Sequence, residues 1–176
     1  MRVVCISAKA QHGKDTAANI LKQHVESKGK RALIIHYADL LKFICRQFFG
    51  WDGTKDESGR TILQHIGTDV VGAKKPEYWA EWVANFLLLF EDEWDFVFIP
   101  DCRYPIELEV VGNAFETWLI RIVRPDFDNG LTTLQQQHSS ETAMDNYLFD
   151  TTIINDGSLD NFKAKLTCWF DYIFDK

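Results

Sequence analysis

The stretch Ala8-Lys9-Ala10-Gln11-His12-Gly13-Lys14-Asp15-Thr16 follows a short apolar run near the start of the chain. It fits most of the pattern Gly-x-x-x-x-Gly-Lys-[Ser/Thr], in which backbone amides surround phosphates, the lysine reaches the β- and γ-phosphates and the hydroxyl group binds magnesium. Ala8 replaces the first glycine of this pattern, and Asp15 replaces the hydroxyl residue. The stretch therefore predicts a phosphate-binding loop, with an ordinary turn between a strand and a helix as the alternative.

The residues on either side of this loop favour phosphate binding. Residues 2–6 form a β-branched run that suits a buried strand, and residues 16–22 favour a helix with one apolar face. Such a helix would direct free backbone N–H groups and the positive end of its dipole at a bound anion. The order of strand, glycine-containing loop and helix is therefore the one that a phosphate site requires.

Length and composition limit the classes of protein that need to be considered. The chain has 176 residues, is 46% hydrophobic and contains no Pro/Gly/Ser-rich linker, so we expect one domain over residues 1–176. The net charge of -7 argues against an extended nucleic-acid surface. No apolar run approaches the roughly 20 residues of a membrane span, and the N-terminus has no signal-peptide core, so we expect a soluble intracellular protein. The four scattered cysteines are expected to be reduced core residues: Cys5, Cys45, Cys102 and Cys168.

Apolar strands and helices alternate along the rest of the chain. We expect strands at residues 31–37, 96–99, 118–123 and 151–154, and helices at residues 39–49, 58–66 and 76–91 and from Ser158 onward. The middle helix would be capped by Ser58 and stopped by Gly67. This alternation predicts an α/β fold with a parallel sheet covered on both faces, and ligands bound beyond the carboxyl ends of the strands.

Polar residues follow the strand at residues 96–99, where such a fold places its site. An apolar strand that ends in Pro100-Asp101 is typical of an element that contacts magnesium or substrate, and Arg103 can hold a phosphate through two hydrogen bonds. Glu107 lies one helical turn beyond Arg103. The alternative is a turn with a salt bridge between these two residues, which contributes only a few tenths of a kcal/mol.

Arg60 and Gln64 share one face of the helix that leads into Gly67-Thr68. The arginine suits a monophosphate, the glutamine suits a base edge, and the glycine allows close backbone approach. The alternative, a solvated helix face that ends in a glycine cap, is the stronger interpretation of this segment taken alone.

A polar stretch from Arg124 to Gln137 is predicted to form a mobile lid, which would exclude water from the phosphates. His138, Ser140 and Glu141 follow it as a compact polar group. Residues 155–158 (Asn-Asp-Gly-Ser) follow the last strand, and they serve either as a turn with a helix cap or as a contact for adenine.

Together these segments resemble the deoxynucleoside monophosphate kinase family of phages and its bacterial relatives, within the P-loop kinases. The resemblance covers nearly the whole chain, and Asp15 is a family trait. The residues that carry it are Gly13-Lys14-Asp15-Thr16, Arg60-x-x-x-Gln64-x-x-Gly67-Thr68-Asp69 with Trp79 after it, Pro100-Asp101-x-Arg103-x-x-x-Glu107, Arg124-Pro125, His138-x-Ser140-Glu141 and Asn155-Asp156-Gly157-Ser158.

The resemblance implies a P-loop kinase domain with a five-stranded parallel sheet, an acceptor-binding helical region at about residues 38–92 and a lid at about residues 124–141. It implies transfer of the γ-phosphoryl group of ATP, with Mg²⁺, to a nucleoside or deoxynucleoside monophosphate. The partners would be small-molecule nucleotides, without nucleic acid or membrane, and a homodimer is left open. The location would be the cytoplasm, that of the host for a phage protein.

The resemblance also implies roles for individual residues. Those expected at ATP are Gly13, Lys14, Asp15, Thr16, Arg124, Asn155 and Gly157. Those expected at the acceptor are Arg60, Gln64, Gly67, Thr68, Trp79, Asp101, Arg103, Glu107, His138 and Glu141. Magnesium would be held by Asp15 and Asp101, and the catalytic residues would be Lys14, Asp15, Arg103 and Arg124.

Two alternatives remain open at this point. One is another small-molecule P-loop kinase, resembling dephospho-coenzyme A kinase or phosphomevalonate kinase. The other is a nucleotide-binding module without catalysis, which is motivated by the departures at Ala8, Ala10 and Gln11. The departure at Ala8 matters only if this residue must adopt a positive φ, because that conformation is unfavourable for any residue with a side chain.

Overall fold

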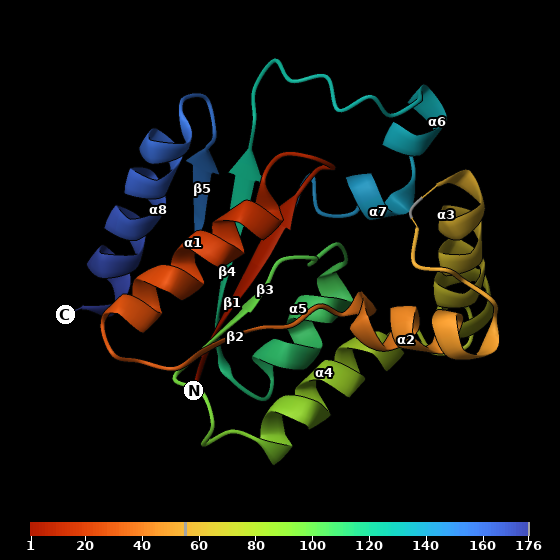
Figure 1. Ribbon diagram of the computed structural model, residues 1–176, viewed down its shortest axis with the longest axis horizontal. Helices are drawn as coiled ribbons and strands as arrows, with labels where there is room; N and C mark the ends of the chain where they lie inside the picture. The colour runs from red at the N-terminus through yellow and green to blue at the C-terminus, as the bar shows by residue number, and fades with distance from the viewer. Residues whose placement is uncertain (55, 176) are drawn as a thin grey trace.

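The computed structural model describes residues 1–54 and 56–175 and is built around a sheet of five parallel strands (Figure 1). The strands are β1 (Arg2–Ala8), β2 (Ala32–Ile34), β3 (Phe96–Ile99), β4 (Glu116–Val123) and β5 (Thr151–Ile154). Their order across the sheet is β2-β3-β1-β4-β5, so the loop after β1 lies between the ends of β3 and β4. The predicted α/β fold with a five-stranded parallel sheet is confirmed.

Helices cover both faces of the sheet. They are α1 (Lys14–Ser27), α2 (Ala38–Phe48), α3 (Glu57–Gln64), the π-helix η1 (His65–Gly72), α4 (Tyr78–Leu89), α5 (Pro105–Gly112), α6 (Thr133–Gln136), α7 (Ser139–Thr142) and α8 (Leu159–Phe174). Side chains of α1 and α8 pack on one face, and side chains of α4 and α5 pack on the other. None of the helices in the described part of the chain is long and apolar enough to span a membrane.

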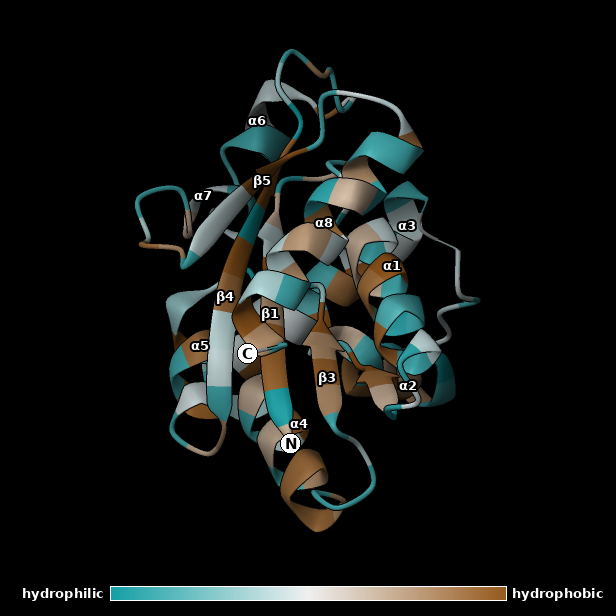
Figure 2. Ribbon diagram, turned by 90° about the vertical axis from the view of Figure 1, so that its left-hand side faces the viewer, coloured by the Kyte–Doolittle hydropathy of each residue, from teal (hydrophilic) through white to brown (hydrophobic). Residues whose placement is uncertain are grey.

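The central strand is apolar at consecutive positions because both faces of the sheet are covered. Neighbouring side chains of a strand point to opposite faces, so Val4 and Ile6 contact the core under α1 and α8 while Val3 and Cys5 contact the core over α4 and α5. Figure 2 shows the hydrophobic residues along β1 and β3 in the interior. This packing fixes the position at which β1 ends and the phosphate loop begins.

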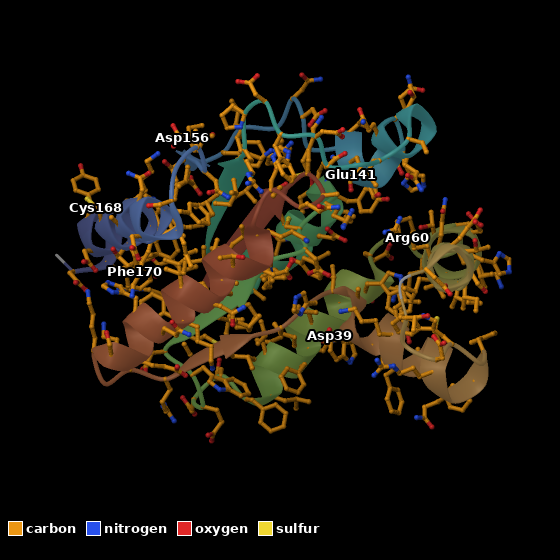
Figure 3. The ribbon with its side chains drawn as sticks, turned by 45° about the horizontal axis from the view of Figure 1, so that its top comes forward. Asp39, Arg60, Glu141, Asp156, Cys168 and Phe170 are labelled. Atoms are coloured by element: carbon orange, nitrogen blue, oxygen red, sulfur yellow. The ribbon has the colours of Figure 1, made fainter. Side chains whose placement is uncertain are left out.

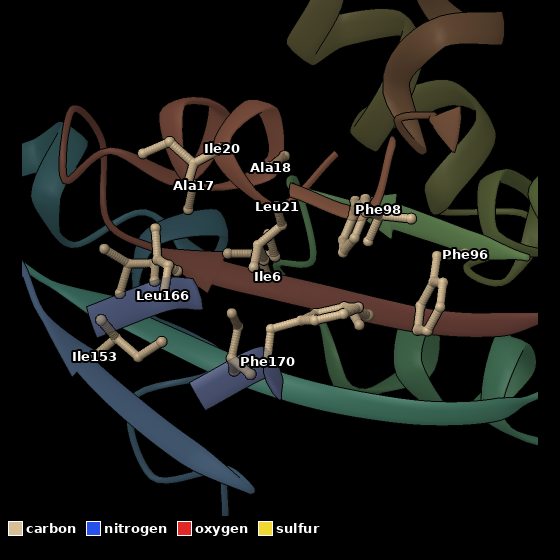
Figure 4. Packing of buried hydrophobic residues seen from close by; sticks show 14 of the residues in the cluster. Ile6, Ala17, Ala18, Ile20, Leu21, Phe96, Phe98, Ile153, Leu166 and Phe170 are labelled. Atoms are coloured by element: carbon tan, nitrogen blue, oxygen red, sulfur yellow. The ribbon is translucent and has the colours of Figure 1, made fainter. Parts of the chain in front are cut away.

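The core under α1 and α8 contains a group of aromatic rings (Figure 4). Phe170 of α8 is 1% exposed, and its ring centroid lies 5.0 Å from that of Phe96 and 4.7 Å from that of Phe174. Both ring pairs are tilted, and aromatic contacts at these distances are favourable beyond the area that they bury. The group attaches the last helix of the chain to the sheet.

The helix after residue 56 begins and ends differently from the prediction. The sequence predicts a cap at Ser58, but Asp56 caps the helix, because its Oδ1 accepts a hydrogen bond of 2.7 Å from Gly59 N. The sequence also predicts an end at Gly67, but α3 continues directly into η1, which runs to Gly72. Both boundary predictions are wrong.

Gly67 allows close packing between helices. A Cβ atom at this residue would lie 2.7 Å from Cδ2 of Leu41 in α2, and Trp79 Nε1 donates a hydrogen bond of 3.1 Å to Gly67 O. A glycine need not end a helix when its neighbours fill the space that a side chain would take. The residue therefore joins η1 to α2 and α4, around a small core of Leu41, Cys45, Trp51 and Ile66.

Two further predictions need correction. Strand β2 ends at Ile34 rather than at residue 37, because carboxylates of Asp39 and Asp101 accept hydrogen bonds from the backbone amides of His36 and Tyr37. All four cysteines are free thiols, but Cys168 is exposed on α8 and is not a core residue.

The aromatic group predicts a large effect on stability. Replacement of the buried Phe170 by alanine removes its ring contacts and leaves a cavity, so we expect urea unfolding to show a loss of about 3–5 kcal/mol. Leu159→Ala is the matched control in the same helix, because Leu159 is 63% exposed and its loss should cost within about 0.5 kcal/mol. Equal effects of the two substitutions would contradict this account of the core.

Candidate active site

The phosphate loop contains two residues in the left-handed region of backbone space. They are Gln11, with a φ of 61°, and Gly13, with a φ of 104°. Ala8 is not among them, because it is the last residue of β1. The first glycine of the pattern is therefore not required here for backbone conformation. The second glycine is required twice, because a Cβ atom at Gly13 would also lie 2.9 Å from Asn155 Nδ2.

Later segments of the chain hold the loop through His12. Asn155 Nδ2 donates a hydrogen bond of 3.1 Å to His12 O, and Arg124 N donates one of 3.1 Å to His12 Nδ1. Burial, with the positive charges of Arg121 and Lys9, lowers the pKa of His12, which suits a ring nitrogen that accepts a hydrogen bond. Two of the predicted ATP contacts, at residues 124 and 155, thus adjoin the loop.

The guanidinium group of Arg124 lies over the ring of Phe127, with 3.9 Å from Cζ to the ring centroid. Asp126, between them, has a φ of 53°, a conformation that aspartate tolerates better than most residues. This turn folds Phe127 back against Arg124, a cation–π contact that the sequence analysis missed.

A row of charged groups runs from the loop to α2. Lys14 Nζ lies 2.9 Å from Asp15 Oδ2, and the imidazole of His36 lies 3.3 Å from Asp15 Oδ1 and 3.3 Å from Asp39 Oδ2. Burial lowers the pKa of His36, but hydrogen bonds to Asp15 and Asp39 outweigh it and raise the pKa to about 9. A hydrogen bond from His36 in turn holds the pKa of Asp15 well below its usual range, against the opposing effect of burial. His36 was missed because its contact with Asp15 appears only in the folded chain, while the contact between His36 and Asp39 is local and was overlooked.

Asp101 lies at the end of β3, as expected, but its carboxylate is engaged with backbone. Its Oδ1 accepts a hydrogen bond of 3.0 Å from Tyr37 N, and its Oδ2 accepts one of 3.1 Å from Ala38 N. These amides begin α2, and a carboxylate at a helix N-terminus is favourable with the helix dipole. In this structure Asp101 therefore fixes the start of the helical region.

Glu107 has a similar role in the next turn. It is 9% exposed, and its Oε2 accepts hydrogen bonds of 2.6 Å from Arg103 N and 3.0 Å from Tyr104 N. Burial and the negative charge of Asp101 raise the pKa of Glu107 to about 8. The side chain of Glu107 caps α5 rather than pairing with the guanidinium of Arg103, so the structure differs from the salt bridge considered as an alternative.

The guanidinium of Arg103 is directed at α7 and the phosphate loop. Arg103 Nη1 lies 2.8 Å from Glu141 Oε1, and the other oxygen, Glu141 Oε2, accepts a hydrogen bond of 2.9 Å from Ala10 N. Beside this contact, Asp145 lies 3.1 Å from Lys9 Nζ and 2.8 Å from Arg121 Nη2. Two carboxylates, Glu141 of α7 and Asp145 just after it, thus attach the loop to this segment, and the role of Asp145 was missed by the sequence analysis.

The predicted acceptor residues of α3 and η1 are mostly exposed. Arg60, Gln64 and Thr68 are exposed. Trp79 of α4 is half-buried, and its Nε1 donates the hydrogen bond to Gly67 O described above. The Nε2 atoms of Gln64 and His138 lie 2.9 Å apart, which brings α3 to α7. Within the described residues, the guanidinium of Arg60 has no hydrogen bond or ion pair. Figure 3 labels Arg60 on α3, on the same side of the molecule as Glu141.

The last two predicted ATP contacts lie at helix starts. Thr16 is exposed in the first turn of α1, directly after Lys14 and Asp15. Gly157 precedes α8, and a Cβ atom there would lie 3.1 Å from Asn161 Oδ1. Ser158 caps α8, because its Oγ accepts a hydrogen bond of 3.2 Å from Asn161 N, so the turn-and-cap role of residues 155–158 is present.

One family model and several solved structures match the chain. The model described as deoxynucleotide monophosphate kinase matches residues 34–166. No match is found among curated proteins. An APS kinase from Mycobacterium tuberculosis, solved in complex with AMPPNP and APS, has a TM-score of 0.57 at 12% identity, and the match covers 97% of each chain. A dephospho-CoA kinase from Campylobacter jejuni has a TM-score of 0.53 at 16% identity, with 99% of each chain covered. Because the identities are this low, the two structures support only the fold of this chain and not its activity.

The charge of His36 predicts a dependence of stability on pH. Its pKa is about 9 in the folded protein and 6.5 for an ordinary histidine, so its contribution is fully present below pH 6.5 and is lost as the pH rises through 9. We expect the nucleotide-free protein to be more stable than His36→Gln by about 1–2 kcal/mol at about pH 6, after allowance for solvent screening, and by much less at about pH 9.5. Urea unfolding at both pH values measures this, and an equal difference at the two would contradict the assigned ion pairs.

Proposed function

The chain belongs to the deoxynucleotide monophosphate kinase family, whose model covers residues 34–166 of 176, and on this premise we propose that it phosphorylates a nucleoside or deoxynucleoside 5′-monophosphate. The γ-phosphoryl group of ATP would pass to an oxygen of the acceptor phosphate, giving ADP and the nucleoside diphosphate. Membership of this family makes the protein a kinase; the nature of the acceptor is the proposal.

One observation carries this proposal: a single carboxylate joins the phosphate loop to Arg103. Glu141 contacts the backbone amide of Ala10 and the guanidinium of Arg103, at 2.9 Å and 2.8 Å. The loop that would hold the donor and the arginine that would hold the acceptor phosphate are thus separated by one side chain. A kinase needs this proximity, because alignment of the two phosphates supplies much of the rate.

The loop residues suit the phosphates of ATP. Lys14 is 17% exposed and lies at the start of α1, where backbone amides and the helix dipole favour an anion. Thr16 follows in the first turn of the helix. Arg124 and Asn155 flank the loop and would contact the rest of the nucleotide, including its base.

Asp15 fits a magnesium ion that enters with the nucleotide. Its carboxylate is 60% exposed beside Lys14, and magnesium in such sites is usually held by one or two carboxylates together with the phosphates. The ion would supply charge neutralisation at the transferred group. Asp101, the second predicted ligand, has both oxygens engaged with backbone amides, so we place the metal role on Asp15 and keep Asp101 as the group that orients α2.

The acceptor would lie between Arg103 and the exposed face of α3. Arg60 would hold its phosphate with Arg103, Gln64 and Thr68 would contact the base or sugar, and Trp79 would support η1 beneath it. The acceptor phosphate is already ionised at neutral pH, so no strong general base is required. We therefore assign catalysis to alignment and to charge neutralisation by Lys14 and the arginines.

A panel of acceptors tests the proposed reaction. ADP release from ATP and Mg²⁺ is measured with each common ribo- and deoxyribonucleoside monophosphate, and with dephospho-coenzyme A and adenosine phosphosulfate as acceptors of other kinases with this fold. We expect at least one nucleoside monophosphate to support turnover well above the ATP-only background. Turnover with only a non-nucleoside-monophosphate acceptor would favour another small-molecule kinase, and nucleotide binding without any turnover would favour a binding module. Either result contradicts the proposal.

Removal of the loop lysine predicts a loss of turnover without a loss of folding. Lys14→Ala should reduce kcat/KM by about 100-fold or more, since the lysine stabilises charge on the phosphates and contributes little to the core. Lys163→Ala is the matched control, because Lys163 is exposed on α8 and is not among the residues proposed to contact a nucleotide. Near-normal kcat/KM in the Lys14 variant would refute the assignment of the loop.

A further inference from the structure

The short helix α7, with its cap His138, connects separate parts of the site. On one side, His138 Nε2 lies 2.9 Å from Gln64 Nε2 of α3. Next to it, the hydroxyl groups of Ser139 and Tyr104 lie 3.1 Å apart, which ties α7 to the turn that carries Arg103. The helix thus contacts the region proposed for the acceptor through two of its consecutive residues.

On its other side, α7 contacts the phosphate loop through Glu141. The side chain of Glu141 is 8% exposed, and its two oxygens have different partners: Arg103 Nη1 at 2.8 Å and Ala10 N at 2.9 Å. Arg103 Nη1 also donates a hydrogen bond of 3.3 Å to Ser140 O. Both oxygens of this buried carboxylate are hydrogen-bonded. If the side chain moved with one partner, the bond to the other would break, and an unpaired buried charge is costly.

We propose that Glu141 is a positioning residue that couples the binding of the two substrates. This inference rests on the proposed function. An acceptor held by Arg103 and by the α3 face containing Gln64 would fix α7 from one side. Glu141 would then hold the amide of Ala10, and with it the phosphate loop, in the orientation that binds the donor. Each substrate would raise the affinity for the other.

The coupling follows from the sharing of one side chain. Two ligands are coupled when each stabilises the same arrangement of a common element, and the coupling is reciprocal. Here the common element is the carboxylate of Glu141 on a helix of only four residues. Asp145 holds Lys9 of the same loop but pairs with Arg121 of β4, so it stabilises the loop without a path to the acceptor region.

Calorimetry on the full-length protein tests the coupling without turnover. AMPPNP with Mg²⁺ is titrated alone and in the presence of a saturating equimolar mixture of the four common deoxynucleoside monophosphates. We expect the mixture to tighten AMPPNP binding by about 5-fold or more in the wild type, within the usual range of coupling between sites. In Glu141→Gln, which keeps the size of the side chain and removes its charge, we expect the effect to fall below about 2-fold.

Two further variants complete the design. Glu116→Gln is the matched control, because it makes the same chemical change at an exposed residue. Glu116 begins β4, its side chain is 63% exposed and it pairs with Arg2 of β1. The coupling in this variant should equal that of the wild type. Glu141→Asp keeps the charge but shortens the side chain, so it should also lose the coupling, and it replaces the glutamine variant if that variant fails to fold. Thermal unfolding checks that each variant is folded.

The outcomes separate this inference from the proposed function. Failure of the deoxynucleoside monophosphate mixture, and of the corresponding mixture of ribonucleoside monophosphates, to bind the wild type would contradict the proposed function, and the coupling with it. Binding of both ligands without mutual effect in the wild type would overturn the coupling alone. Equal coupling in the wild type and in a folded Glu141 variant would show that another element carries it, which also overturns the assignment.

Discussion

The phosphate loop holds its shape because later segments of the chain bind its backbone and side chains. The contacts to Ala10, Gln11 and His12 come from residues 112 to 143 positions further along the sequence. Gly13 provides the left-handed turn, and Asn155 packs where a side chain at that residue would lie. A local motif is therefore completed only when β4, β5 and the segment between them are in place, and the parallel sheet brings the carboxyl ends of the strands to the same edge.

Charge in the site is organised as pairs, although the chain carries a net charge of -7. Carboxylates near the loop each contact a cation or a backbone amide: Asp15 with Lys14 and His36, Asp101 with the start of α2, and Glu141 with Arg103 and Ala10. Charges that are paired in this way fix the positions of the groups around them. The positive charge that a polyphosphate requires is thus gathered at one edge of an acidic protein.

The sequence predicted the features that depend on local pattern. The strand and helix around the loop, the five parallel strands and the cap at Ser158 follow from the spacing of apolar residues and from capping chemistry. The end of a helix at Gly67 was wrong, because contacts with Leu41 and Trp79 decide how the chain continues there. The contacts of His36 with Asp15 and of Asp145 with Lys9 could not be predicted, since these partners become neighbours only through the folded topology. The contact of Phe127 with Arg124 is local, but it depends on the positive φ of Asp126 between them. The roles assigned to individual site residues remain predictions.

An inhibitor that joins adenosine, through five phosphates, to the nucleoside whose monophosphate is the best acceptor measures directly whether donor and acceptor sites adjoin. Its affinity is compared by calorimetry with that of AMPPNP, in the presence of Mg²⁺. If Lys14 and Arg103 bind the phosphates of two neighbouring nucleotides, the joined molecule should bind at least about 10-fold more tightly than AMPPNP, since the second nucleotide binds at high effective concentration. It should also be displaced by that nucleoside monophosphate as well as by ATP. An affinity equal to that of AMPPNP, with displacement by ATP alone, would contradict a two-nucleotide site.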